Sequence, residues 1–170
     1  CLPTGLRDDS TREGGPLGEV VFASLTELDE LNSDNSDIFV GNADGTEVTR
    51  ITHYAGPDHS PSWSPDRSMI AFASDRDEPG NLDVYVMDSE GETQTRITTS
   101  PAIDTGPECS PDGSSIAFER ATADGHSEIY IISPDGTAET RVTPPNLDAA
   151  QPSWSPDSQC LAFAANVSGL

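Results

Sequence analysis

Three stretches of the chain are near copies of one another: SPSWSPDRSMIAFAS (60–74), GPECSPDGSSIAFER (106–120) and QPSWSPDSQCLAFAA (151–165). Their Ser-Pro-Asp triplets begin at Ser64, Ser110 and Ser155, so the spacing is 46 and then 45 residues. Each triplet predicts a turn, because proline fixes φ at the second turn position and aspartate tolerates the third. A regular period of this length indicates that one structural unit is used several times.

A second set of stretches repeats with the same period: DIFVGNADGTEVTRIT (37–52), DVYVMDSEGETQTRIT (83–98) and EIYIISPDGTAETRVT (128–143). Each begins with an acidic residue and a run of β-branched and aromatic residues, which is typical of a strand. The Asp-Gly or Glu-Gly pair that follows predicts a hairpin turn. The two sets give four strand-like pieces per copy, and EVVFAS (19–24) matches the second piece of an earlier, incomplete copy.

Four strands in a repeat of about 40–45 residues are the signature of a β-propeller blade. We therefore predict an all-β chain of blades with four antiparallel strands each and no sizeable helix. The expected blades span 19–56, 57–102 and 103–148, with a partial blade at 149–170 and an N-terminal arm or tether at 1–18. These pieces amount to about three and a quarter blades, whereas closed propellers typically have at least four, so we expect a partial or open propeller.

The repeat also predicts which side chains are equivalent. Aromatic residues at one position of the second strand are expected to be buried in every blade: Phe22, Phe72, Phe118 and Phe163. The same is expected of Trp63, Cys109 and Trp154 on the first strand. Arg67 and Ser158 stand where the third copy has Gly113, so their turns should be strained or of another type.

The combination Trp-Ser-Pro-Asp-Gly, Ile-Ala-Phe, Asp-Ile-Tyr-Val and Arg-Ile-Thr closely resembles the TolB-type, WD-like β-propeller repeat, over about residues 19–165. The motifs are specific for the blade and not for a function, because the family includes transport-linked periplasmic proteins, peptidase gating domains and carbohydrate-active enzymes. By this resemblance Asp58, His59 and Asp104 line an axial channel and contact a ligand or cation. The alternative is ordinary loop polarity.

The charge balance narrows the classes of partner. The chain has 30 acidic residues and eight basic ones, all arginine, for a net charge of −22. Binding to nucleic acid or to an anionic membrane is not expected, because both need clustered cations. Membrane attachment is expected only through a lipid on Cys1, because processed bacterial lipoproteins begin in this way. An artificial or proteolytic boundary is the alternative interpretation of that first residue.

The loop Asp75–Asp83 is the densest group of oxygen ligands in the sequence. Ca²⁺ binds six to eight oxygen ligands. Four residues of this loop could coordinate it: Asp75, Asp77, Asn81 and Asp83. The alternative is that these residues only build the hairpin. Asn166 begins the one Asn-X-Ser/Thr triplet and is a glycosylation acceptor where the source has that machinery.

No G-x-S-x-G or H-E-x-x-H motif is present, so we expect no enzyme activity. The leading hypothesis is an extracytoplasmic module for protein–protein association that binds further copies of itself head to tail, as an oligomer or fibre. The alternative is a fragment of a larger TolB-like propeller of a periplasmic binding protein, a peptidase or a polysaccharide-active enzyme.

Overall fold

The computed structural model describes residues 18–25, 35–145 and 147–166. The described residues contain thirteen strands and no helix, which confirms the all-β prediction. They are β1 (Glu19–Leu25), β2 (Ser36–Asn42), β3 (Thr49–Arg50), β4 (Asp58–Trp63), β5 (Met69–Ser74), β6 (Asp83–Asp88), β7 (Thr95–Arg96), β8 (Asp104–Cys109), β9 (Ile116–Ala121), β10 (Ser127–Ile132), β11 (Thr140–Arg141), β12 (Asp148–Trp154) and β13 (Leu161–Asn166).

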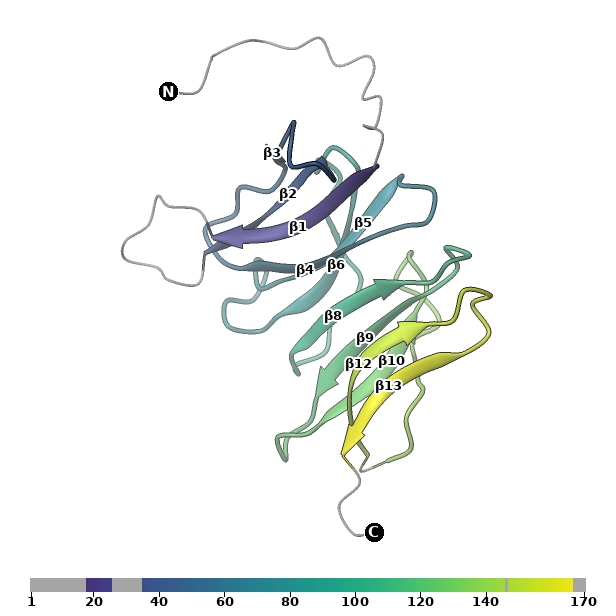
Figure 1. The fold of residues 1–170 in the computed structure, drawn as a ribbon. Helices are drawn as coiled ribbons and strands as arrows, with labels where there is room; N and C mark the ends of the chain where they lie inside the picture. The colour runs from purple at the N-terminus through teal and green to yellow at the C-terminus, as the bar shows by residue number, and fades with distance from the viewer. Residues whose placement is uncertain (1–17, 26–34, 146, 167–170) are drawn as a thin grey trace.

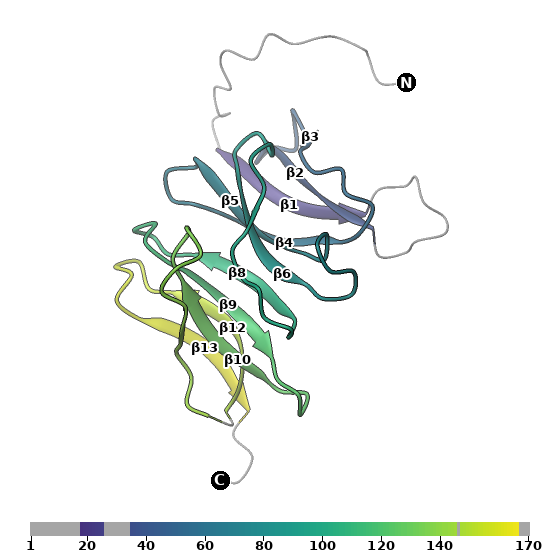
Figure 2. The same cartoon turned by 180° about the vertical axis from the view of Figure 1, so that it is seen from behind.

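The strands form four antiparallel sheets in chain order: β1-β2-β3, β4-β5-β6-β7, β8-β9-β10-β11 and β12-β13. Figures 1 and 2 show the sheets one after another, with the first and last described strands at opposite ends of the molecule. The two middle sheets are complete four-stranded blades. This arrangement agrees with the predicted partial propeller.

The Ser-Pro-Asp turns connect the first and second strands of three sheets. In the second sheet the Ser64 hydroxyl donates to the Asp66 carboxylate at 2.7 Å and accepts from the Met69 amide at 3.0 Å. The fourth turn position is left-handed in all three copies, with φ of 59° at Arg67, 73° at Gly113 and 58° at Ser158. The turns are therefore of one kind, and the two non-glycine residues are strained.

The sheets pack through one repeated interface. Phe72 and Tyr85, paired across β5 and β6, pack against Ile38 and Val40 of the preceding sheet. One sheet further on, Phe118 and Tyr130 pack in the same way against the face that holds Ala71, Val84 and Ile97. An aromatic pair thus packs on small and β-branched residues at both of these junctions, between the first and second sheets and between the second and third.

The end sheets correct part of the core prediction. Phe72 and Phe118 are fully buried as expected, but Phe22 is 36% exposed and Phe163 is only half-buried. The reason is that no described sheet covers the Phe22 side of the first blade, and no third or fourth strand accompanies β12 and β13 among the described residues. The first-strand residues Trp63, Cys109 and Trp154 are half-buried rather than buried.

Candidate functional site

The two aspartates predicted to line a channel begin β4 and β8, the first strands of the second and third sheets. Asp58 and Asp104 are both fully buried. Asp58 is bonded to Arg76 at 2.8 Å, and Asp104 is bonded to Arg120 through both carboxylate oxygens at 2.7 Å. The partner of Asp104 lies within β9 of the same sheet, and the partner of Asp58 lies in the loop that follows β5, so each aspartate has its own arginine.

Each of these arginines lies over aromatic rings of the blade interface. The Arg120 guanidinium is 4.5 Å from the ring centre of Tyr130 and 5.3 Å from that of Phe118. Arg76 lies 4.9 Å from Phe72 and 5.1 Å from Tyr85 in the same manner. A cation over an aromatic face gains about 0.5–2 kcal/mol, so these arginines join the carboxylates to the core.

Burial and the bonds between the partners act in opposite directions on the pKa values of Asp104 and Arg120. Desolvation raises the pKa of Asp104, although the bonds from Arg120 act in the opposite direction. Burial alone would lower the pKa of Arg120, but its bonds to Asp104 and Glu139 outweigh that effect and raise it. In the second sheet, Asp58 Oδ2 is buried and has no hydrogen-bond partner among the described residues. That oxygen is the acceptor that Asp58 still offers.

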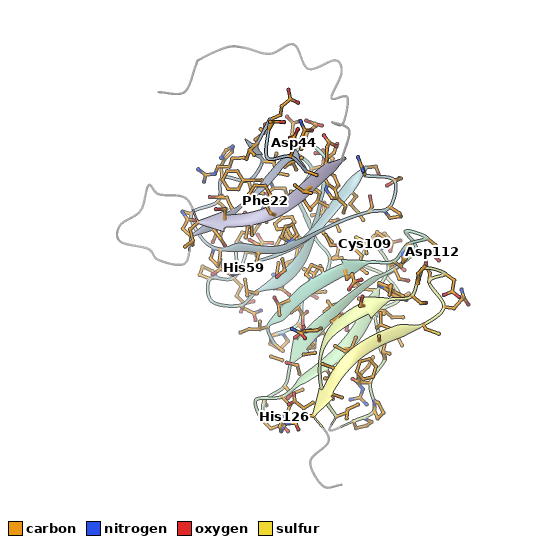
Figure 3. All side chains as sticks on the ribbon, viewed as in Figure 1. Phe22, Asp44, His59, Cys109, Asp112 and His126 are labelled. Atoms are coloured by element: carbon orange, nitrogen blue, oxygen red, sulfur yellow. The ribbon has the colours of Figure 1, made fainter. Side chains whose placement is uncertain are left out.

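His59 contributes to the contact between the first two sheets. Its Nδ1 lies 3.3 Å from the Ser36 hydroxyl, which itself donates to the Asp58 carbonyl at 2.9 Å. Because the hydroxyl proton is used in that bond, His59 Nδ1 acts as the donor to Ser36. A serine nucleophile needs the opposite arrangement, in which histidine accepts the proton, so this contact joins sheets rather than activating Ser36. Figure 3 labels His59 at this end of β4.

The four predicted calcium ligands make separate interactions in the structure. Asp75 Oδ2 accepts from the Gly80 amide at 2.8 Å, and Asp77 accepts from the Tyr85 hydroxyl, which with burial raises the tyrosine pKa. Asn81 donates to the Ser100 carbonyl at 3.0 Å, and Asp83 is paired with Arg96. Over residues 18–25, 35–145 and 147–166, no three His, Cys, Asp or Glu side chains gather into a metal-binding group. Calcium binding by this loop remains a prediction.

Asp83 belongs instead to a polar clamp that the sequence motifs did not reveal. Thr98 accepts from the Val84 amide at 2.9 Å and donates to Asp83 at 3.0 Å, and burial raises the pKa of Asp83. In the first sheet Thr52 likewise accepts from the Ile38 amide and donates to Asp37, which is paired with Arg50. In the third sheet Thr143 accepts from the Ile129 amide, and Arg141 is paired with Glu128. The signal that could have indicated it is the repeated Arg-Ile-Thr, or Arg-Val-Thr in the third copy, because its arginine and threonine bond to the third strand of the same sheet.

A small pocket of about 90 Å³ lies beside the β9–β10 hairpin, where Figure 3 labels His126. Its lining is Thr122, Asp124, His126, Glu128 and Leu147. His126 Nδ1 lies 3.4 Å from an oxygen of Asp148, at the start of β12. The sequence indicated no role for His126, because its place in the repeat differs from those of the other two histidines.

The remaining candidate residues are the glycosylation acceptor, the lipidation site and the other two cysteines. Asn166 is exposed at the end of β13, and Cys1 lies outside the described residues. Burial raises the pKa of Cys109 to about 11, so that thiol is protonated and unreactive at neutral pH. Cys160 is exposed, and no disulfide is present among the described residues.

Four-stranded blades, an axial row of inner strands and the interblade aromatic pairs define a β-propeller. Residues 77–170, more than half of the chain, match the family model of the TolB beta propeller domain. The chain belongs to that family.

Solved structures agree with this assignment. TolB from Agrobacterium tumefaciens matches with 26% identity and a TM-score of 0.70, over 84% of this chain and 50% of that one. TolB from Acinetobacter baumannii matches with 22% identity and a TM-score of 0.66, over 84% of this chain and 34% of that one. A gluconolactonase from Xanthomonas campestris, at 12% identity and a TM-score of 0.60, covers 89% of this chain and 52% of that one, and it shares the fold alone.

The chain thus spans half the length of the first of these structures and a third of the second. No curated protein matches the sequence. Within the described residues, no helix is long and apolar enough to cross a membrane.

Proposed function

We propose that this chain is a non-enzymatic, extracytoplasmic propeller module that works by protein–protein association, and that another copy of the chain is a direct partner. The main supporting observation is that, among the described residues, no sheet covers the outer faces of the first and last sheets, although the two middle sheets bury the equivalent surfaces. The extracytoplasmic location is supported by membership of the TolB family, whose transport-linked members are periplasmic.

The first sheet presents an aromatic pair on its open face. Phe22 and Phe39 lie opposite each other in the β1–β2 register, with ring centres 5.7 Å apart. This is the geometry of Phe118 and Tyr130, whose ring centres are 5.8 Å apart and which pack on the preceding sheet. Val20 is 40% exposed on the same strand. We call Val20, Phe22 and Phe39 the head face.

The last sheet presents the complementary kind of surface. Ala162 and Ala164 of β13 are exposed and correspond in register to Ala71 and Ala73 of β5, which are fully buried. We call Ala162 and Ala164 the tail face. Head-to-tail docking would place an aromatic pair on small residues, as at the described junctions. A contact of this type joins different surfaces and therefore propagates as a ring or an open fibre.

Charge opposes this association. A net charge of −22 on each copy is repulsive over a Debye length, which is about 10 Å at 0.1 M salt and about 3 Å at 1 M. Assembly should therefore strengthen with salt or divalent cations.

Light scattering after size-exclusion chromatography tests the proposal with three variants at high salt. Phe22→Glu should block the head face and Ala164→Glu the tail face, whereas Val48→Glu changes an exposed residue of the β2–β3 loop and serves as control. Each blocked variant alone should be monomeric. A mixture of the two should form a dimer, since one supplies an intact head and the other an intact tail. A monodisperse unmodified monomer at high salt and calcium would contradict the proposal.

The second candidate is that these sheets belong to a larger propeller, in which further blades cover both faces. The match to only half of the Agrobacterium chain favours this reading. It predicts monomers for every variant above, and a restored ring when the flanking coding sequence is expressed with this segment. Under this reading the whole protein is a periplasmic binding protein, a peptidase or a polysaccharide-active enzyme.

A further inference from the structure

Two carboxylate oxygens without donors lie at the corner of the second sheet where β4 begins and β5 ends (Figure 1). Asp58 begins β4 and lies opposite Ser74, the last residue of β5, and Asp75 follows Ser74. Asp58 Oδ2 and Asp75 Oδ1 are both buried, and neither has a hydrogen-bond partner among the described residues. A buried acceptor without a donor is unfavourable, so the pair needs an explanation.

The third sheet shows how the Asp58 oxygen comes to lack a partner. There, Arg120 lies opposite Asp104 in the strand register and bonds to both of its carboxylate oxygens. In the second sheet Ser74 holds the position of Arg120, and Arg76 supplies the guanidinium from two residues further on. Arg76 reaches Asp58 Oδ1 at 2.8 Å, and its Nε donates to the Ser74 hydroxyl at 3.0 Å. Asp58 Oδ2 therefore keeps an unused acceptor.

The second sheet also has a carboxylate here that the third sheet lacks. Asp75 holds the position of Ala121. Asp75 Oδ2 accepts from the Gly80 amide at 2.8 Å, whereas Oδ1 lies so close to Gly56 that a Cβ atom added to this glycine would be 2.6 Å from it. Gly56 is two residues before Asp58 in the chain, so both unpartnered oxygens belong to one corner.

The charges at this corner do not balance. Burial raises the pKa of the neighbouring Tyr54, the charges of Asp75 and Asp58 raise it as well, and the charge of Arg76 lowers it. The Arg76 guanidinium lies 5.6 Å from the centre of the Tyr54 ring. These ionised groups carry two negative charges and one positive charge, so one negative charge is left without a partner in a region where charges are poorly screened.

We propose that a monovalent metal cation, Na⁺ or K⁺, binds between Asp58 Oδ2 and Asp75 Oδ1. A single positive charge balances the corner, whereas a water molecule would supply donors and leave the charge uncompensated. A divalent ion such as Ca²⁺ takes more oxygen ligands, and over residues 18–25, 35–145 and 147–166 no three acidic, histidine or cysteine side chains gather to hold one. Because both oxygens are buried, a bare ion fits better than a cationic side chain of a partner.

Melting curves of the full chain in NaCl, KCl and choline chloride test the proposal. Equal salt concentrations keep the ionic strength the same, and choline is too large to enter a buried corner. The melting temperature should be higher in NaCl or KCl than in choline chloride by about 3 °C or more, because the ion binds only the folded state. The salt with the higher value identifies the preferred ion. Equal melting temperatures in all three salts would overturn the proposal.

Two variants separate this corner from the rest of the acidic surface. Asp75→Asn removes the charge that calls for a cation, so the difference between the salts should vanish. Glu78→Gln removes one charge from an exposed position of the same loop, and the difference should persist. Because the measurement is a difference between salts, a general loss of stability in a variant does not affect it. A difference that survives in Asp75→Asn, or that is lost in Glu78→Gln, would contradict the proposal in favour of general cation binding by surface carboxylates.

Discussion

Replacing Phe118 by alanine is expected to lower the free energy of unfolding by about 3–5 kcal/mol. The ring is fully buried between the second and third sheets, where it packs with Ala71, Val84 and Ile97 and lies 5.8 Å from the Tyr130 ring. Truncation removes the transfer free energy of the ring and leaves a cavity between two sheets that cannot easily collapse. Since domains are stable by only about 5–15 kcal/mol, this is a large share of the total.

Phe22→Ala is the matched control, because it removes the same ring from the same register position. Phe22 is 36% exposed and lies on an open face, so its truncation should cost roughly 1–2 kcal/mol. Urea unfolding of both variants, followed by far-ultraviolet circular dichroism at micromolar concentration, measures the difference. Equal losses would refute the reasoning that burial by a neighbouring blade sets the value of each aromatic residue, or would show that the head face is covered in solution.

Four further outcomes are expected. Thr98→Val should cost about 1–3 kcal/mol in urea unfolding, because the Val84 amide loses its buried acceptor, while Thr95→Val on an exposed position should change little. Arg67→Gly should stabilise by up to about 1 kcal/mol, since φ at that position is 59°, and a destabilised variant would contradict the strain argument. Hydrogen bonds from serine or threonine side chains lower the pKa values of five turn aspartates below the ordinary 3.8: Asp44, Asp66, Asp112, Asp135 and Asp157. The unfolded state therefore binds more protons than the folded state near that pH, and the free energy of unfolding should fall as the pH drops below about 4. Carboxyl NMR titration and melting curves measured at several pH values check this. If the Asp75–Asp83 loop binds Ca²⁺, the melting temperature should rise with millimolar calcium, and Asp75→Asn with Asp77→Asn should abolish the rise; an unchanged melting curve in the unmodified chain would exclude the site.

The fold could be predicted because the sequence of each strand occurs in several copies along the chain. A single Ile-Ala-Phe run is ambiguous between strand and helix, but three copies with a turn at the same place are not. Burial could be predicted only for copies with neighbours on both sides, which is why Phe72 and Phe118 agreed and Phe22 and Phe163 did not. Exposure of an end blade depends on what covers it, and that is not a property of the residues in the blade.

The candidate site was harder to predict because carboxylates serve several purposes in this chain. The residue types of Asp58 and Asp83 are those of a ligand site, yet in the structure they form ion pairs with Arg76 and Arg96. The partners could not be identified from spacing, since Arg76 follows its strand by two residues while Arg120 lies within its strand. Tertiary geometry decides which of many acidic residues meet the few arginines.

The scarcity and placement of those arginines also determine how trypsin would digest the protein. The chain has eight arginines and no lysine, and trypsin cleaves after only these two residue types. Arg50, Arg96, Arg120 and Arg141 lie in strands and are bonded to acidic side chains, whereas Arg67 is in a turn with half of its side chain exposed. Among the described residues, trypsin is therefore expected to cleave first after Arg67. Cleavage after the arginines in strands should require local unfolding of a blade.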